Sequence, residues 1–313
     1  MNKLVKVALV AAVITALGAM STAAHAAGPV ALPAGDTIYQ ANYSDDPAAL
    51  WTTASDGTAT VIGTPATSGL SQVVDGAWNP STGKSYVIGN GYDGPCELWE
   101  ANLTTGQFTL IAAITGDEGD TYNCDAFDIA PDGTAWVSLY DSGTDGYLAQ
   151  LNLTDGTTSA AVPFSGLGNG VTWIAIQPST GVVFLGDWDN ALYTVDTATG
   201  AATIVDSSST YGASIYDAAF DSTGRLWLTG WPETTELLSA DVANFGASLV
   251  VQGAILVGGD GDVTGTDSLW IVRGPAPAAL ASTGVDSSIV LAGGFSMLVL
   301  GFGAIALRRS RRA

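Results

Sequence analysis

Three aspartates recur at a similar place before turns and are the first candidates for chemistry. Asp75, Asp125 and Asp217 each lie seven or eight residues before a turn glycine. Carboxylate oxygens are the ligands that Ca²⁺ prefers, so aspartates repeated in this way could converge on a divalent cation. The same placement suits a structural role, in which each carboxylate accepts hydrogen bonds from backbone N–H groups. We favour the structural role and keep a metal or catalytic site at these aspartates as the alternative.

A second group of candidates combines acids with aromatic rings in long loops. Planar rings beside carboxylates suit the binding of sugars, and clustered carboxylates suit Ca²⁺. No stretch fits an EF-hand loop, so Ca²⁺ is a candidate and no cofactor is certain. The residues of this predicted ligand face are Tyr92, Asp93, Tyr140, Asp187, Trp188, Asp189 and Trp231.

The histidine content limits the chemistry further. His25 is the only histidine in the chain, and it lies in a segment that we expect to be removed. Ser-His-Asp and Cys–His catalysis and histidine zinc sites are therefore not expected in the mature protein. A glycosidase pair of carboxylates stays open, because acids are plentiful and no spacing selects two of them. These observations favour binding over catalysis.

Charge indicates which partners the protein can have. The chain has 9 basic and 30 acidic residues and a formal net charge of −21. Segment 27–283 keeps only Lys84, Arg225 and Arg273 as basic residues and carries a charge of −26. Such a surface repels nucleic acid and anionic lipid and attracts cations. We expect no nucleic-acid partner, and solubility of a secreted protein is the simpler reason for the charge.

The elements that must position these residues repeat along the chain. A turn glycine is followed three residues later by an aromatic ring, and the spacings between successive turns are 50, 48 and 43 residues. A second series of glycine turns falls half a period later, between segments that alternate apolar and polar residues. Each unit of about 45 residues therefore predicts four short strands, which is typical of a β-propeller blade. The glycine–aromatic pairs are Gly83–Tyr86, Gly133–Trp136, Gly181–Phe184 and Gly224–Trp227, with Gly35–Tyr39 and Asp267–Trp270 as less regular members.

The two ends of the repeat predict how the ring closes. The N-terminal unit, 36–63, lacks a first strand, and the C-terminal piece, 255–272, lacks a following hairpin. Pairing of the two ends within one blade gives an all-β propeller of five blades, with six as the alternative. The repeated aromatic rings are expected to pack between blades. Tight turns share one face of such a ring and the long loops share the other, so we place the ligand face on the long-loop side.

Two cysteines predict one disulfide. Cys96 is expected in a loop between the second and third strands of one blade. Cys124 is expected in the loop that leads to the next blade, on the same face. An even number of cysteines outside the cell is typical of a disulfide, and the topology permits this one.

The terminal segments predict export and anchoring. Lys3 and Lys6 precede an apolar stretch and a small-residue cleavage site between Ala26 and Ala27, as in a signal peptide. Near the other end, an apolar run of 19 residues, 289–307, is followed by four arginines. Such a run rises about 28 Å as a helix, enough to cross a bilayer core, and the arginines stay on the cytoplasmic side.

The motif Leu280, Ala281, Ser282, Thr283 and Gly284 precedes this run. The three features in this order resemble the sorting signal of sortase-anchored proteins of Gram-positive bacteria, with Ala281 in place of the usual proline. The resemblance implies cleavage after Thr283, sortase as a partner, covalent linkage to peptidoglycan, and a secreted, wall-anchored location. A plain membrane anchor is the alternative. The predicted segments are a signal peptide (1–26), a β-propeller (27–273), a Pro/Ala spacer (274–279), the sorting motif (280–284), a transmembrane helix (289–307) and a basic cytoplasmic tail (308–313).

One blade carries a further resemblance. The stretch from Asp217 to Trp227 resembles the blade motif of regucalcin-like gluconolactonases and streptogramin-lyase-type propellers. In the lactonases, the aspartate at the position of Asp217 binds the catalytic metal. Their further glutamate and asparagine have no clear counterparts here, the fourth-blade position being Thr172 or Trp173, and the lyases need histidine. We therefore expect a surface module that binds glycans or other ligands, with a lactonase-type hydrolase or a glycosidase as the alternative.

Overall fold

Four-stranded antiparallel sheets are the unit of this fold. The computed structural model describes residues 30–42, 48–63, 69–90, 95–116, 123–140, 146–159, 161–231, 234–257, 261–262 and 268–274. The predicted cleavage site at Ala26–Ala27, the sorting motif, the apolar run and the basic tail lie outside these residues. Within them, no helix is long and apolar enough to cross a membrane.

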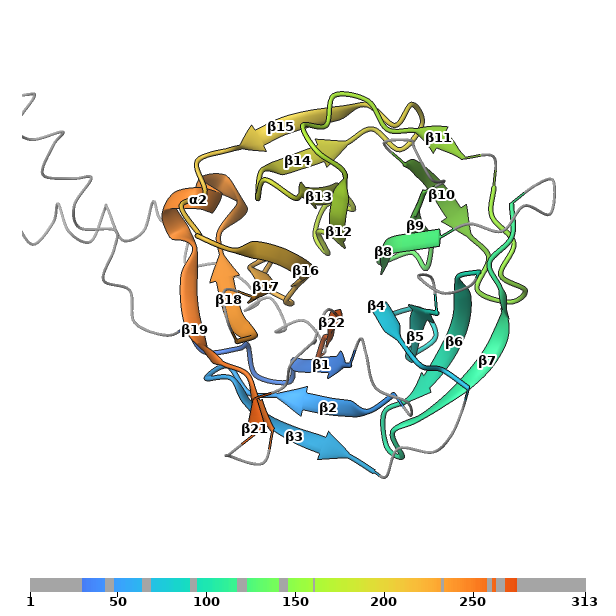
Figure 1. Cartoon of the computed structure of the whole chain (residues 1–313), viewed down its shortest axis with the longest axis horizontal. Helices are drawn as coiled ribbons and strands as arrows, with labels where there is room; N and C mark the ends of the chain where they lie inside the picture. Colours follow the sequence, from blue (N-terminus) through green and yellow to red (C-terminus); the bar gives the residue numbers. More distant parts are fainter. Residues whose placement is uncertain are drawn as a thin grey trace, which may run out of the picture. The chain divides into compact units, whose positions relative to one another are not determined.

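Five sheets stand around a central axis as the blades of a propeller, so the predicted all-β fold and blade number are confirmed (Figure 1). In each blade the innermost strand lies at the axis, and outermost strands such as β7 and β15 run along the rim. The strands of four blades are, in blade 2, β4 (Val73–Asn79), β5 (Lys84–Gly89), β6 (Glu97–Asn102) and β7 (Gln107–Ala113); in blade 3, β8 (Asn123–Ile129), β9 (Ala135–Tyr140), β10 (Tyr147–Leu151) and β11 (Val162–Pro163); in blade 4, β12 (Val171–Ile176), β13 (Val183–Asp187), β14 (Leu192–Val195) and β15 (Ala202–Asp206); and in blade 5, β16 (Ser214–Phe220), β17 (Leu226–Trp231), β18 (Glu236–Ala240) and β19 (Val250–Ala254).

Blade 1 closes the ring by joining the two ends of the described chain. The C-terminal strand β22 (Ser268–Val272) is innermost and pairs antiparallel with β1 (Thr37–Ala41), which leads to β2 (Leu50–Thr53) and β3 (Thr58–Ile62). At the rim, β20 (Leu256–Val257) pairs in parallel with β3 and antiparallel with β21 (Gly261–Asp262). The Asp36 carboxylate also accepts hydrogen bonds from the N–H groups of Ser222 (2.7 Å) and Gly274 (2.9 Å). The predicted closure is confirmed.

Closure corrects one detail of the repeat. Trp270 was grouped with the aromatic residues of the second strands, but β22 supplies the first strand of its blade, and Tyr39 opposite it belongs to the second. The two rings stack with centroids 6.0 Å apart. The spacing from a turn to an aromatic residue cannot distinguish the first strand of a blade from the second, because both strands place a ring between blades.

The repeated rings pack between blades, as predicted. Tyr86, Phe184 and Trp227 are buried, and Phe184 meets Phe220 of the next blade edge to face, with centroids 5.5 Å apart. Trp136 keeps part of its surface accessible. These contacts exclude water between sheets that could not bury both faces alone.

The second series of turn glycines also connects neighbouring blades. These residues have positive φ, and a Cβ on any of them would overlap a backbone carbonyl oxygen of the preceding blade. Glycine is therefore required both by its conformation and by the close approach of another chain segment. The pairs are Gly57–Ala254, Gly106–Ile62, Gly156–Ala113 and Gly200–Pro163. In blade 5 the corresponding connection is not a glycine turn but a short helical segment, η1 (Val242–Asn244) and α2 (Phe245–Ser248). The side chain of Asp241 accepts a hydrogen bond from the Ala243 N–H.

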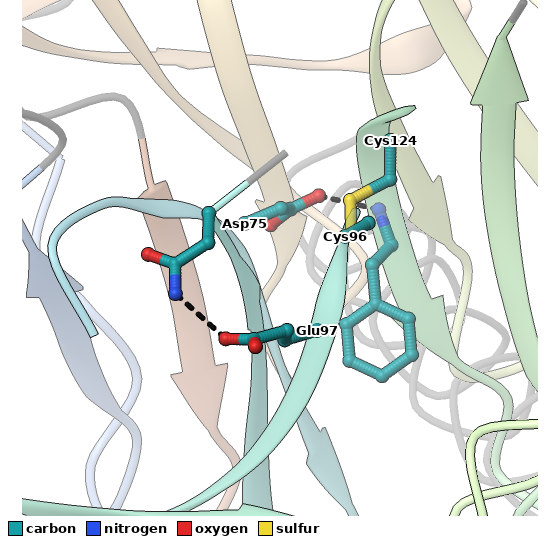
Figure 2. Close-up of a disulfide and its surroundings, with 6 residues drawn as sticks. Asp75, Cys96, Glu97 and Cys124 are labelled. Atoms are coloured by element: carbon teal, nitrogen blue, oxygen red, sulfur yellow. Dashed lines mark hydrogen bonds between the residues drawn. A yellow bond between two sulfur atoms is a disulfide. The ribbon is translucent and has the colours of Figure 1, made fainter. Parts of the chain in front are cut away.

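The predicted disulfide joins blades 2 and 3 (Figure 2). The Cα atoms of Cys96 and Cys124 are 5.9 Å apart and both residues are fully buried. Cys124 lies within β8, not in the loop before it. Next to the bridge, Asn90 donates a 2.6 Å hydrogen bond to Glu97, which ties the loop before β6 to the end of β5. The bridge therefore fixes one blade to the next close to the axis.

Candidate functional site

The innermost strands carry two of the predicted aspartates in equivalent positions. Asp75 of β4 pairs in register with Ile88, and Asp217 of β16 pairs with Thr229, each directly after a bulge. Both side chains are at most 2% exposed. Asp75 accepts a hydrogen bond from its neighbour Gly76 and one of 2.6 Å from Phe127 in blade 3. Asp217 likewise accepts from Ala218 and from Leu269 in blade 1. Each carboxylate therefore links the innermost strands of two neighbouring blades.

Asp75 and Asp217 also contact each other. Their side chains are hydrogen-bonded, although they come from blades 2 and 5. Burial raises the pKa of both carboxyls well above the usual range, and the charge of Asp75 raises the pKa of Asp217 further. Two carboxylates in contact cannot both ionise easily, so the pair retains a proton well above the pH at which an ordinary aspartate loses it.

Asp125 does not join this pair, and its predicted equivalence to Asp75 and Asp217 is wrong. The register shift in β8 falls between Cys124 and Ala126, so Ala126 occupies the equivalent position and Asp125 is the bulged residue. The turns explain the error. The Gly83 N–H bonds the carbonyl of Asn79, four residues back, whereas the Gly133 N–H bonds that of Ala130, three back. Asp125 is half-buried, and burial raises its pKa to about 7.

In blade 4, Trp173 occupies the equivalent position and Thr172 is the bulged residue. A tryptophan therefore stands where the lactonase resemblance would need a polar ligand.

Asp128 is a further buried acid at the axis that the spacing did not predict. Its carboxylate accepts hydrogen bonds from Ile129 (2.7 Å) and from Ile176 of blade 4 (2.6 Å). It is thus a third link between innermost strands. Burial raises the pKa of Asp128 to about 6, against the opposing charge of Arg273. The available signal was a single acid within the apolar run 126–130.

These carboxylates do not fit a metal site of lactonase type. All four oxygens of Asp75 and Asp217 already accept a backbone N–H. Among the described residues, no three acids, cysteines or histidines are grouped closely enough to hold a metal ion. The geometry supports the structural role that the sequence favoured.

An aromatic surface lies on the long-loop side, across blades 4 and 5. We define it as Trp188, Tyr216 and Trp231. Tyr216 is the central ring: its centroid is 5.8 Å from Trp188, at an interplanar angle of 86°, and 6.1 Å from Trp231, at 54°. The two tryptophans are each 41% exposed. Both tryptophans were predicted for the ligand face, whereas Tyr216 was not.

Two polar side chains hold the loop that carries Trp188. Asp187 was predicted as a ligand residue, but it is buried and structural. It accepts hydrogen bonds from the N–H groups of Asp189 (3.0 Å) and Ala191 (2.9 Å) and from the Tyr193 hydroxyl (2.9 Å). Asn190, with φ of 59°, donates to the Ala213 carbonyl and accepts from the Ile215 N–H. Asn190 thereby fixes the loop against the strand that carries Tyr216.

Two neighbouring residues, Gly170 and Asp189, form the surroundings of Trp188. Gly170 leaves room for the indole, because a Cβ there would be 3.3 Å from Cδ1 of Trp188. Asp189 is exposed, and its carboxylate accepts no hydrogen bond from any residue that the structure describes. The rings are therefore held by structured loops, and the residue directly after Trp188 carries a carboxylate to which no described residue donates a hydrogen bond.

The structure describes one further aromatic residue of the predicted ligand face. Tyr140 ends β9 in blade 3 and is half-buried. Tyr92 and Asp93 lie outside the described residues. On the tight-turn side, a cavity of about 500 Å³ lies between blades 3 and 4, beside Pro131, Trp136 and Pro178.

Comparison with known proteins finds only low similarities. The sequence matches no protein-family model and no curated protein. Similar solved structures include TolB from Acinetobacter baumannii, with 14% identity and a TM-score of 0.44 over 70% of this chain and 54% of that one. Another is regucalcin, a calcium-binding protein from Agrobacterium tumefaciens, with 18% identity and a TM-score of 0.40 over 69% of this chain and 74% of that one. The chain thus spans about half the length of the A. baumannii TolB. Similarities at this level do not assign a function.

Proposed function

We propose that this five-bladed propeller is an extracellular binding module whose ligand, a glycan, is held by the aromatic surface of Trp188, Tyr216 and Trp231. The observation that carries the proposal is the contact of three rings, two of them 41% exposed, on loops fixed by Asp187 and Asn190. Exposed rings on a rigid support bind ligands with little loss of conformational entropy. The proposed wall anchoring depends on the sequence resemblance of residues 280–313 alone.

Removing one ring should weaken glycan binding. In Trp188→Ala, we expect the affinity for a glycan bound by the native protein to fall at least tenfold, since an exposed aromatic anchor typically contributes 1.4 kcal/mol or more, roughly. Glycan-array screening followed by calorimetry would measure the loss. Leu110→Ala is the matched control, because Leu110 is 48% exposed on the rim strand β7. Equal binding by both variants would remove the aromatic surface as the site.

A divalent-metal hydrolase of lactonase type is the second candidate. It is supported by the position of Asp217 beside Asp75 at the axis and by the fold that the chain shares with calcium-binding regucalcin. It is opposed by the backbone hydrogen bonds that all four carboxylate oxygens accept.

Calcium removal separates the two candidates. We expect the same melting temperature in chelator and in about millimolar Ca²⁺ at matched ionic strength, because the carboxylate oxygens at the axis already accept backbone hydrogen bonds. A bound ion would raise the melting temperature, since a ligand of the native state stabilises that state by mass action. Matched sodium chloride is needed because the acidic surface responds to salt. A rise with Ca²⁺ that is lost in Asp217→Asn would favour the hydrolase.

A further inference from the structure

In the part of the chain that the structure describes, the aromatic surface is accompanied by few basic side chains. The described residues include three basic side chains, and each is engaged: Lys84 pairs with Glu100 at 2.8 Å, Arg225 donates to Ser239, and Arg273 donates to the Phe220 carbonyl. A sugar acid or phosphate would meet no cation here, and a net charge of −21 would repel it. The ligand is therefore neutral or positively charged.

The carboxylate of Asp189 favours the positive class. It is exposed, it follows Trp188 directly, and no described side chain or N–H bonds it. An ammonium group on the ligand would find in Asp189 a partner that costs no existing hydrogen bond. A neutral ligand would leave this carboxylate unused.

The angle between the rings also favours a positively charged ligand. Trp188 and Tyr216 are nearly perpendicular, at 86°, with centroids 5.8 Å apart. In such an edge-to-face contact the edge of one ring lies against the face of the other, so the two rings offer surfaces at right angles, unlike a flat stacking platform. A pyranose can place its C–H face on one ring while an ammonium substituent lies within about 6 Å of the other centroid, the range of a cation–π interaction.

Building on the proposed function, we propose that the ligand is a glycan with free amino groups, a polymer of de-N-acetylated hexosamine. Its sugar rings contact Trp188, Tyr216 and Trp231, and its ammonium groups pair with Asp189. The general negative charge of the protein attracts the polymer, and the aromatic surface with Asp189 selects it.

A matched pair of ligands tests this inference. Calorimetry would compare the β-1,4-linked tetramers of glucosamine and of N-acetylglucosamine in dilute buffer near pH 5, roughly, where the amino groups are protonated and an ordinary aspartate is ionised. We expect the glucosamine tetramer to bind the native protein at least tenfold more tightly. Asp189→Asn should lower that affinity several-fold and leave the acetylated tetramer unaffected, whereas Trp188→Ala should weaken both.

Each other outcome rejects one part of this proposal. Equal or tighter binding of the acetylated tetramer rejects the amino-sugar ligand and leaves the proposed binding function intact. Unchanged binding of the glucosamine tetramer by Trp188→Ala means that general charge alone holds it, which rejects the site. If neither tetramer binds, the amino-sugar inference is wrong, and the proposed function fails only if the glycan array is also negative. Circular dichroism of both variants confirms that they are folded.

Discussion

The free energy of unfolding is expected to fall as the pH rises from about 4 toward neutrality, because Asp75 and Asp217 hold a proton in the folded protein. Their pKa values are raised by burial, and that of Asp217 also by the neighbouring charge of Asp75. In the unfolded chain each aspartate loses its proton near pH 4, roughly. Above that pH the folded state binds more protons than the unfolded state, so stability is fully present below the unfolded pKa and is lost toward the folded pKa.

The expected slope is about 1.4 kcal/mol per pH unit for each retained proton. Asp128 and Asp125 add to the loss, since burial raises their pKa values to about 6 and about 7. Three other aspartates act in the opposite direction. Each accepts hydrogen bonds from the threonine two residues later, which lower the pKa of Asp56, Asp132 and Asp155. Their contribution is lost only as the pH falls below about 4. Stability should therefore be greatest near pH 4 to 5, roughly.

Urea unfolding at several pH values and constant ionic strength measures this slope. Asp217→Asn should flatten it by about one proton, because the amide carries no charge. The amide NH₂ replaces an oxygen that accepts a backbone N–H, so this variant should also be less stable than the native protein at every pH. Asp132→Asn, at an exposed turn, should keep the native slope above pH 4, roughly. If the slope above that pH is the same in native protein and Asp217→Asn, the carboxyls do not share a proton.

The blade repeat was predictable because local rules and the whole fold agree on it. Turn glycines and aromatic rings recur since every blade needs the same hairpins and the same packing between sheets. Five blades followed from the missing first strand of unit 36–63, which β22 supplies. The role of Trp270 was misread because first and second strands both place a ring between blades.

The site was only partly predictable, because it depends on register and on contacts between blades. A turn that is one residue longer in blade 2 than in blade 3 was enough to misplace Asp125. The contact of Asp75 with Asp217 joins blades 2 and 5, and no sequence spacing encodes it. Trp188 and Trp231 were predicted as exposed loop rings, but Tyr216, which joins them, belongs to a strand.

Gly200→Ala is expected to destabilise the propeller by about 4 kcal/mol. Gly200 has φ of 72°, where a side chain costs about 1–2 kcal/mol. A Cβ would also overlap the carbonyl oxygen of Pro163 in blade 3. The Ser165 N–H donates a 3.1 Å hydrogen bond to the Gly200 carbonyl, so the two blades cannot separate without losing that bond. Overpacking against a fixed backbone costs a further 1–3 kcal/mol, roughly.

Gly181→Ala separates the two costs. Gly181 has φ of 71°, follows a threonine as Gly200 does, and donates a 2.8 Å bond to the carbonyl four residues back, again as Gly200 does. No atom lies within 4 Å of a Cβ placed there. This control should lose only the conformational cost, about 1–2 kcal/mol. Urea midpoints of the two variants give the difference, which measures how strongly the turn of one blade holds the strand of the next. Equal losses would mean that the conformation of the turn, and not the contact between blades, is why glycine recurs in this series.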